Sequence, residues 1–123
     1  MRSEYCGSAK ITYFDREAVW KALRELAPRL AADHPEIVKI AVFGSLVRNE
    51  AVPGSDVDVL LVLEASDIPF RDRASRYRPS RFPVGVDLFA YTQVEIERML
   101  SESNFFLKRA LQEAVTLYER ESS

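Results

Sequence analysis

Three aspartates are the residues of this sequence best suited to carry chemistry. Asp56 and Asp58 stand two apart at the head of the apolar run Val57–Leu63, and Asp87 lies inside a second run, Val84–Ala90. Side chains of a strand alternate between its faces, so Asp56 and Asp58 should project from one face, with backbones about 7 Å apart. Carboxylates on that base can converge on two metal ions about 3.5–4 Å apart.

The aspartates predict a magnesium or manganese site. Like charges beside an apolar strand are costly unless a cation neutralises them, and all-oxygen sites suit Mg²⁺ or Mn²⁺ rather than zinc. A lone charge inside an apolar strand is rarely left unpaired, so Asp87 would complete the cluster if its strand lies beside the first. The alternative is that Asp56 caps a turn, Asp58 is a surface residue and Asp87 pairs with an arginine.

A glycine and a serine follow the apolar run Ile37–Phe43. Gly44 would let the backbone approach a bulky ligand, and a short helical turn over Ser45–Arg48 would offer its N–H groups to an anion. Ser45 could cap that turn and bind a phosphate, while Arg48 could add positive charge. The alternative is an ordinary turn at the end of a strand. A phosphate site that ends one strand, followed by a metal site that begins the next, is what nucleoside triphosphate chemistry requires.

The remaining elements must position these groups. Apolar residues from Val19 to Leu30 recur at helical spacing and predict a helix that begins near Thr12, with Asp15 as the second half of a capping box. Pro28 should kink this helix or end its regular part. The three short apolar runs described above predict strands.

The C-terminal part predicts two helices and a strand. Thr92 and Glu95 form a capping box for one helix, and the apolar spacing over Asn104–Val115 predicts a second helix. Thr116–Tyr118 could be a short final strand. The order helix, three strands, two helices predicts a small sheet covered by helices, an α/β or α+β fold.

Length and composition narrow the class of protein. At 123 residues we expect one domain over 1–123, with a core of about 12–119. A net charge of −2 argues against generic nucleic-acid binding, and Cys6, the only cysteine, cannot form an internal disulfide. The N-terminus does not resemble a signal peptide, and no stretch approaches the roughly 20 apolar residues of a membrane span. We therefore expect a cytoplasmic protein that does not associate with membranes.

The connection between residues 71 and 81 is rich in arginine. It holds five arginines, at positions 71, 73, 76, 78 and 81, and one acidic residue, Asp72. The net charge of the whole chain, in contrast, is negative. Such a run is typical of a solvated loop. It could instead guide an anionic acceptor, hold a triphosphate or dock an acidic partner surface.

These motifs together resemble a known signature. Gly44-Ser45, ten further residues, Asp56-Val57-Asp58 and a later aspartate resemble the pattern of the DNA polymerase β-like nucleotidyltransferase superfamily. Ser55 just before Asp56, and the short length, resemble the minimal nucleotidyltransferases of bacteria and archaea. The resemblance implies a mixed sheet flanked by helices.

It also implies a role for each motif. Asp56, Asp58 and Asp87 would bind two Mg²⁺ ions, or Mn²⁺, as the catalytic and metal-binding residues. ATP would be the donor, with Gly44 and Ser45 on its triphosphate. The remaining candidate nucleotide-binding residues are Arg48 and Ser55.

Finally, the resemblance implies a partner. Minimal nucleotidyltransferases are commonly encoded beside a HEPN-domain protein, a toxic ribonuclease, and act as its antitoxin by adenylylating one of its tyrosines. We therefore expect Mg²⁺-dependent transfer of AMP from ATP to a hydroxyl acceptor, a tyrosine of a HEPN toxin, within a hetero-oligomer. Two alternatives stay open: a non-catalytic nucleotide-binding antitoxin that acts by contact, and a small-molecule nucleotidyltransferase.

Overall fold

A mixed four-stranded sheet forms the centre of the molecule. The computed structural model describes residues 14–121, in the order α1 (Arg16–Asp33), β1 (Ile37–Phe43), β2 (Val57–Leu63), α2 (Phe70–Tyr77), β3 (Val86–Thr92), α3 (Gln93–Ser101), α4 (Phe105–Glu113) and β4 (Val115–Glu119). The strand order is β3-β2-β1-β4, in which β2 and β3 are parallel and the other pairs are antiparallel. This α+β architecture confirms the predicted fold class and the mixed sheet.

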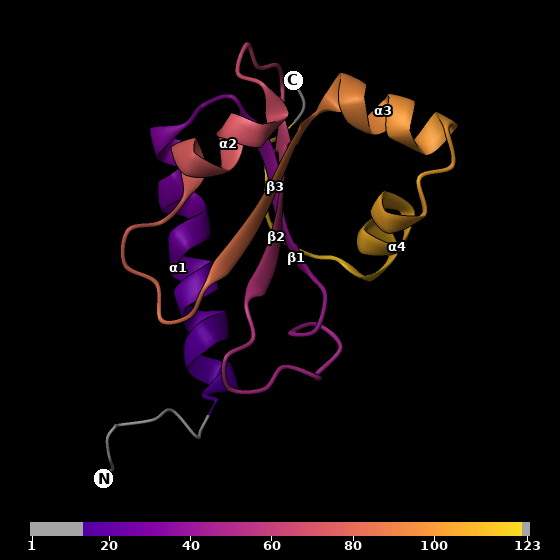
Figure 1. The fold of residues 1–123 in the computed structure, drawn as a ribbon. Coiled ribbons are helices and arrows are strands. Elements are labelled where there is room, and N and C mark those ends of the chain that lie inside the picture. The colour runs from indigo at the N-terminus through magenta and orange to yellow at the C-terminus, as the bar shows by residue number, and fades with distance from the viewer. Residues whose placement is uncertain (1–13, 122–123) are drawn as a thin grey trace, which may run out of the picture.

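Helices cover both faces of the sheet. Figure 1 shows α1 on one side and α3 with α4 on the other. Val57, Val59 and Leu61 of β2 pack in the cluster that contains the buried residues of α1. Leu60 pairs instead with the cluster of α4. Because side chains alternate along a strand, Asp58 shares the face of Leu60 and is directed toward α4.

The first helix begins differently from its prediction, and Pro28 does not end it. Thr12 lies outside the described residues, and Asp15 is itself the N-cap, since its side chain accepts from the Ala18 N–H. The helix also continues through Pro28 as far as Asp33. Pro28 is exposed, so the carbonyl that it deprives of a donor can be hydrated, and the helix need not end there.

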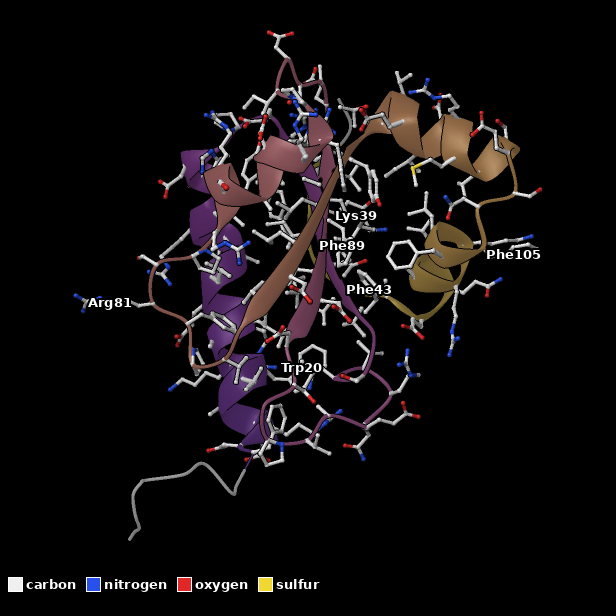
Figure 2. All side chains as sticks on the ribbon, viewed as in Figure 1. Trp20, Lys39, Phe43, Arg81, Phe89 and Phe105 are labelled. Atoms are coloured by element: carbon white, nitrogen blue, oxygen red, sulfur yellow. The ribbon has the colours of Figure 1, made fainter. Side chains whose placement is uncertain are left out.

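The arginine-rich connection is helical in its first part rather than a loop throughout, and one of its five arginines, Arg73, is buried. Residues Phe70–Tyr77 form α2, and Arg73 and Tyr77 are buried on its inner side, four residues apart. Residues at i and i+4 of a helix share a face, so the long stem of Arg73 can be buried beside the Tyr77 ring. Arg81 follows in the segment before β3 and points away from the protein in Figure 2.

The other elements follow the sequence closely. β1 and β2 have the predicted bounds, and β3 covers Val86–Thr92 rather than Val84–Ala90. Thr92 and Glu95 form the predicted capping box. The predicted helix over Asn104–Val115 is shorter, with Asn104 as its N-cap, and the final strand is present. Within residues 14–121 no helix combines the length and apolarity that crossing a membrane would need.

Candidate functional site

Two of the three aspartates face each other across neighbouring strands. Asp58 of β2 and Asp87 of β3 are direct partners in the parallel ladder, where strands lie about 4.8 Å apart. The Val57 N–H donates to the Gly85 carbonyl at 2.9 Å, which fixes the register at this point. Asp56 immediately precedes β2, so all three carboxylates gather at one end of the sheet.

The electrostatics of Asp58 reflect this gathering. Burial raises the pKa of Asp58, and the negative charges of Asp87 and Asp56 raise it further. Arg48 acts in the opposite direction without cancelling the effect. The shifted pKa means that the site favours added positive charge, whether as a proton or as a cation.

Two glycines leave room for the carboxylates. Gly44 has φ +86°, and a Cβ at this position would collide with Oδ2 of Asp58. A Cβ at Gly85 would likewise collide with Oδ1 of Asp56. At Gly44 the left-handed backbone and the close approach both favour glycine. The carboxylates are therefore accommodated by backbone that carries no side chain.

The residues fit a hard divalent cation by their chemistry. In the described part of the chain, no three His, Cys, Asp or Glu side chains are already gathered closely enough to hold a metal ion. However, Asp56 and Asp87 are exposed and Asp58 is half-buried, so these side chains have space to turn. An all-oxygen set of mutually repelling carboxylates is the donor set that Mg²⁺ or Mn²⁺ prefers.

The glycine-serine segment is a run of turns rather than a helix. The Arg48 N–H donates to the Gly44 carbonyl at 3.1 Å, and the Glu50 N–H donates to the Ser45 carbonyl at 2.8 Å. The predicted helical turn over Ser45–Arg48 is therefore limited to one i→i−4 hydrogen bond, from Arg48 to Gly44. It brings the Arg48 side chain back over the end of β1.

Arg48 is not a free cation, and its partner was missed in the sequence. Its Nη1 donates to both oxygens of Glu113, at 3.0 and 2.9 Å, and its Nε donates to Glu50 at 3.0 Å. Glu113 Oε2 also accepts from the Gly44 N–H at 2.6 Å. A separation of 69 residues between Glu113 and Gly44 leaves no local sequence signal for this contact.

A cavity opens between Asp58 and α4. It measures about 390 Å³ and is lined by Phe43, Gly44, Arg48, Asp58, Phe105, Phe106, Arg109, Ala110 and Glu113. In Figure 2 the labelled Phe43 lies between the sheet and α4, whereas Phe105 points outward from α4. Phe105 is 81% exposed, an unusual position for a phenylalanine beside a charged site.

The other sequence-predicted residues have structural contacts. The Ser55 hydroxyl accepts from the Val52 N–H at 3.0 Å and closes the turn before Asp56. In the arginine-rich segment, Arg73 pairs with Glu95 at the opposite end of β3 from Asp87. Ser45 is half-buried beside Gly44.

Comparisons with known proteins agree with this geometry. The family model of the nucleotidyltransferase domain matches residues 21–122 and so includes every candidate site residue. The sequence matches none of the curated proteins. A Sulfolobus solfataricus protein assigned as a nucleotidyltransferase has a similar structure, with a TM-score of 0.60 and 21% identity over 88% of this chain and 86% of that one.

Two toxin–antitoxin crystal structures are also similar. One, with AMP-PNP, has a TM-score of 0.52 and 17% identity over 80% of this chain and 74% of that one. The other is a MntA-HpeT variant with two aspartate-to-glutamate substitutions, with a TM-score of 0.50 and 15% identity over the same shares. At these identities the structures establish a shared fold. Because the family match spans most of the sequence, the chain belongs to the nucleotidyltransferase domain family, a minimal member of the DNA polymerase β-like superfamily.

Proposed function

We propose that this protein transfers AMP from ATP to a hydroxyl acceptor in a reaction that depends on Mg²⁺ or Mn²⁺. One observation carries the proposal: Asp58 and Asp87 are direct partners on parallel strands, with Asp56 beside them and the Gly44 turn within contact of Asp58. Members of the family transfer nucleotidyl groups, and this is the part of the molecule where anionic phosphates and cations could meet.

The candidate residues divide into two groups. Asp56 and Asp58 would hold both metal ions and Asp87 one of them. When bound, the ions supply positive charge that offsets the charge of the phosphates. The triphosphate would lie on Gly44, Ser45 and the neighbouring residues Arg48 and Ser55, through backbone N–H groups, hydroxyls and the guanidinium.

The proposed reaction is an in-line displacement. The acceptor oxygen forms a bond to the α-phosphorus while the bond to the bridging oxygen breaks, and pyrophosphate leaves with that electron pair. The acceptor proton passes to Asp87, which faces the same end of the sheet as Asp58. No histidine or cysteine is required.

We further propose a cytoplasmic antitoxin whose acceptor is a tyrosine of a HEPN toxin. Two similar structures are toxin–antitoxin complexes; one contains AMP-PNP, and the other carries substitutions at two aspartates. The exposed Phe105 and Phe106 lie beside the candidate site and could contact such a partner. The exposed arginines Arg71 and Arg81 could steer an acidic partner surface toward the protein.

The test is the intact mass of a co-purified partner protein. After incubation with ATP and Mg²⁺, the partner should gain the mass of one or more AMP units, and peptide mapping should locate them on a tyrosine. Partner incubated with the Asp58→Asn protein should remain unmodified. A stable complex whose partner never gains AMP would reject transfer and favour an antitoxin that acts by contact alone.

A further inference from the structure

Glu113 engages two anion-binding groups of the candidate site, the Gly44 N–H and the Arg48 guanidinium. It is the last residue of α4, and its carboxylate accepts from the Gly44 N–H at 2.6 Å and from Arg48 Nη1 at 2.9 and 3.0 Å. A backbone N–H and a guanidinium on one carboxylate form short, charge-assisted hydrogen bonds. The same pair of donors would suit a phosphate oxygen equally well.

The carboxylate of Glu113 is ionised in this position. Burial opposes its charge, but the Gly44 N–H and Arg48 outweigh burial, and the pKa of Glu113 lies below its usual value. Its side chain is 18% exposed and that of Arg48 is 34% exposed, so solvent reaches the pair and the contact can open. An anion that arrives from the cavity would meet an occupied position rather than free donors.

The charge of Glu113 is also unfavourable for the aspartate cluster. It is one of the negative charges that raise the pKa of Asp58. An ion pair that served stability alone would not require a second carboxylate close to Asp58. The position is easier to explain if the carboxylate stands where a more highly charged anion binds.

We propose that Glu113 is an internal competitor of the nucleotide: it occupies a phosphate subsite formed by Gly44 N–H and Arg48, and the triphosphate displaces it. The inference rests on the proposed function for the identity of the anion, a nucleoside triphosphate. Displacement releases the Glu113 side chain from Gly44 and Arg48 at the last residue of α4, the helix whose first two residues, Phe105 and Phe106, line the same cavity. Nucleotide binding is thereby coupled to the side of the cavity on which an acceptor could dock.

The test compares Glu113→Gln with Glu50→Gln. Both changes remove one negative charge from a partner of Arg48, but only Glu113 also accepts from Gly44. The probe is inorganic tripolyphosphate without metal, titrated calorimetrically at low ionic strength. Loss of the competing carboxylate should tighten binding about tenfold in Glu113→Gln, whereas Glu50→Gln should change it by no more than about twofold.

Equal effects of the two substitutions would overturn the proposal, because charge removal alone would then explain them. Weaker binding by Glu113→Gln would also overturn it, since Glu113 would then be a support for Arg48. Should Glu113→Gln fail to fold, the wild-type Gly44 amide resonance provides the measurement. A shift of that resonance on tripolyphosphate binding supports displacement, and an unchanged resonance in the bound protein excludes it.

The two proposals fail separately. Tighter tripolyphosphate binding by Glu113→Gln without any AMP transfer by the wild type leaves the subsite in place and rejects the proposed reaction. AMP transfer by the wild type, with equal tripolyphosphate affinity in both variants, supports the reaction and rejects Glu113 as competitor.

Discussion

The parallel pair β2–β3 carries charge at both ends, and the two ends are built in opposite ways. At the first end Asp58 faces Asp87, and at the last Leu63 pairs with Thr92, whose capping box contains Glu95. Thr92 lies five positions after Asp87, a length of about 17 Å along the strand. The two charged regions are thus independent of each other.

At the end that contains Thr92, the far end, the charged side chains of Arg73 and Glu95 are paired with each other. Arg73 is buried, and its guanidinium donates to Glu95 at 2.7 and 3.0 Å, to the Ala90 carbonyl at 3.0 Å and to the Ile68 carbonyl at 2.7 Å. The hydrogen bonds from Arg73 hold the pKa of Glu95 at about 2. Here opposite charges stabilise the ionised forms and hold α2, β3 and α3 together.

At the near end, where Asp58 faces Asp87, the reverse holds: burial and the negative charges of Asp87, Asp56 and Glu113 raise the pKa of Asp58. Charge that serves the fold is paired within the chain, whereas within residues 14–121 none of the three aspartates forms an ion pair, and the nearby Arg48 is engaged by Glu113 and Glu50. We infer from this difference that the near end binds a ligand.

The largest effect is expected for Asp56→Ala with Asp58→Ala. Transfer should fall on the order of 10³-fold or more, because the main metal ligands are lost, while the melting temperature in EDTA should stay level or rise. Radiolabelled ATP and thermal melts measure the two outcomes. Asp67→Ala, an exposed aspartate at the other end of β2, is the control. Activity that survives the double substitution would contradict a two-metal site.

Arg73→Met should cause the largest loss of stability. Removing the cation leaves Glu95 without its partner, at a cost of about 3–5 kcal/mol in the free energy of unfolding. Urea denaturation measures this cost. Arg71→Met, an exposed arginine of the same helix, should change the free energy by no more than about 0.5 kcal/mol. Equal costs for the two variants would remove the distinction between paired and solvated arginines.

Glu95 should make the far end sensitive to acid. The pKa of Glu95 is lowered from 4.5 to about 2 on folding. The contribution of Glu95 to the free energy of unfolding is therefore fully present above pH 4.5 and is lost as pH falls toward 2. Glu95→Gln should therefore cost about 2 kcal/mol at pH 7, and its difference from wild type should narrow as pH is lowered below 4.5. A difference that stays constant between pH 7 and pH 3 would contradict the assignment.

Asp58 should show the opposite sign and the smallest effect. Its pKa is raised on folding, so the ionised carboxylate destabilises the metal-free protein at neutral pH, and this penalty disappears below the unfolded value of 3.8. Asp58→Asn in EDTA should gain at most about 1 kcal/mol at pH 7 and nothing at pH 3.5. Urea denaturation of wild type and Asp58→Asn at the two pH values measures this difference. A loss of stability in Asp58→Asn at pH 7 would contradict the claim that repulsion and burial destabilise the ionised Asp58.

Local patterns in the sequence predict much of this arrangement. Alternation along Val57–Leu63 places Asp58 on the face opposite Val57, and short apolar runs give the strands. What sequence patterns miss depends on contacts between distant residues. Arg73 can be buried because it pairs with Glu95, which is 22 residues away in the sequence. Arg48 pairs with Glu113, which is 65 residues away. Neither pairing leaves a periodicity that could be read in the chain.

The binding of Mn²⁺ tests the central claim most directly, because it depends on neither a partner nor turnover. Electron paramagnetic resonance can count the ions bound in the presence of AMP-PNP to wild type, to Asp67→Ala and to the double variant of Asp56 and Asp58. We predict two ions for wild type and for Asp67→Ala, and none for the double variant at the same concentrations. Equal numbers of bound ions in all three proteins would contradict a metal site built from these aspartates.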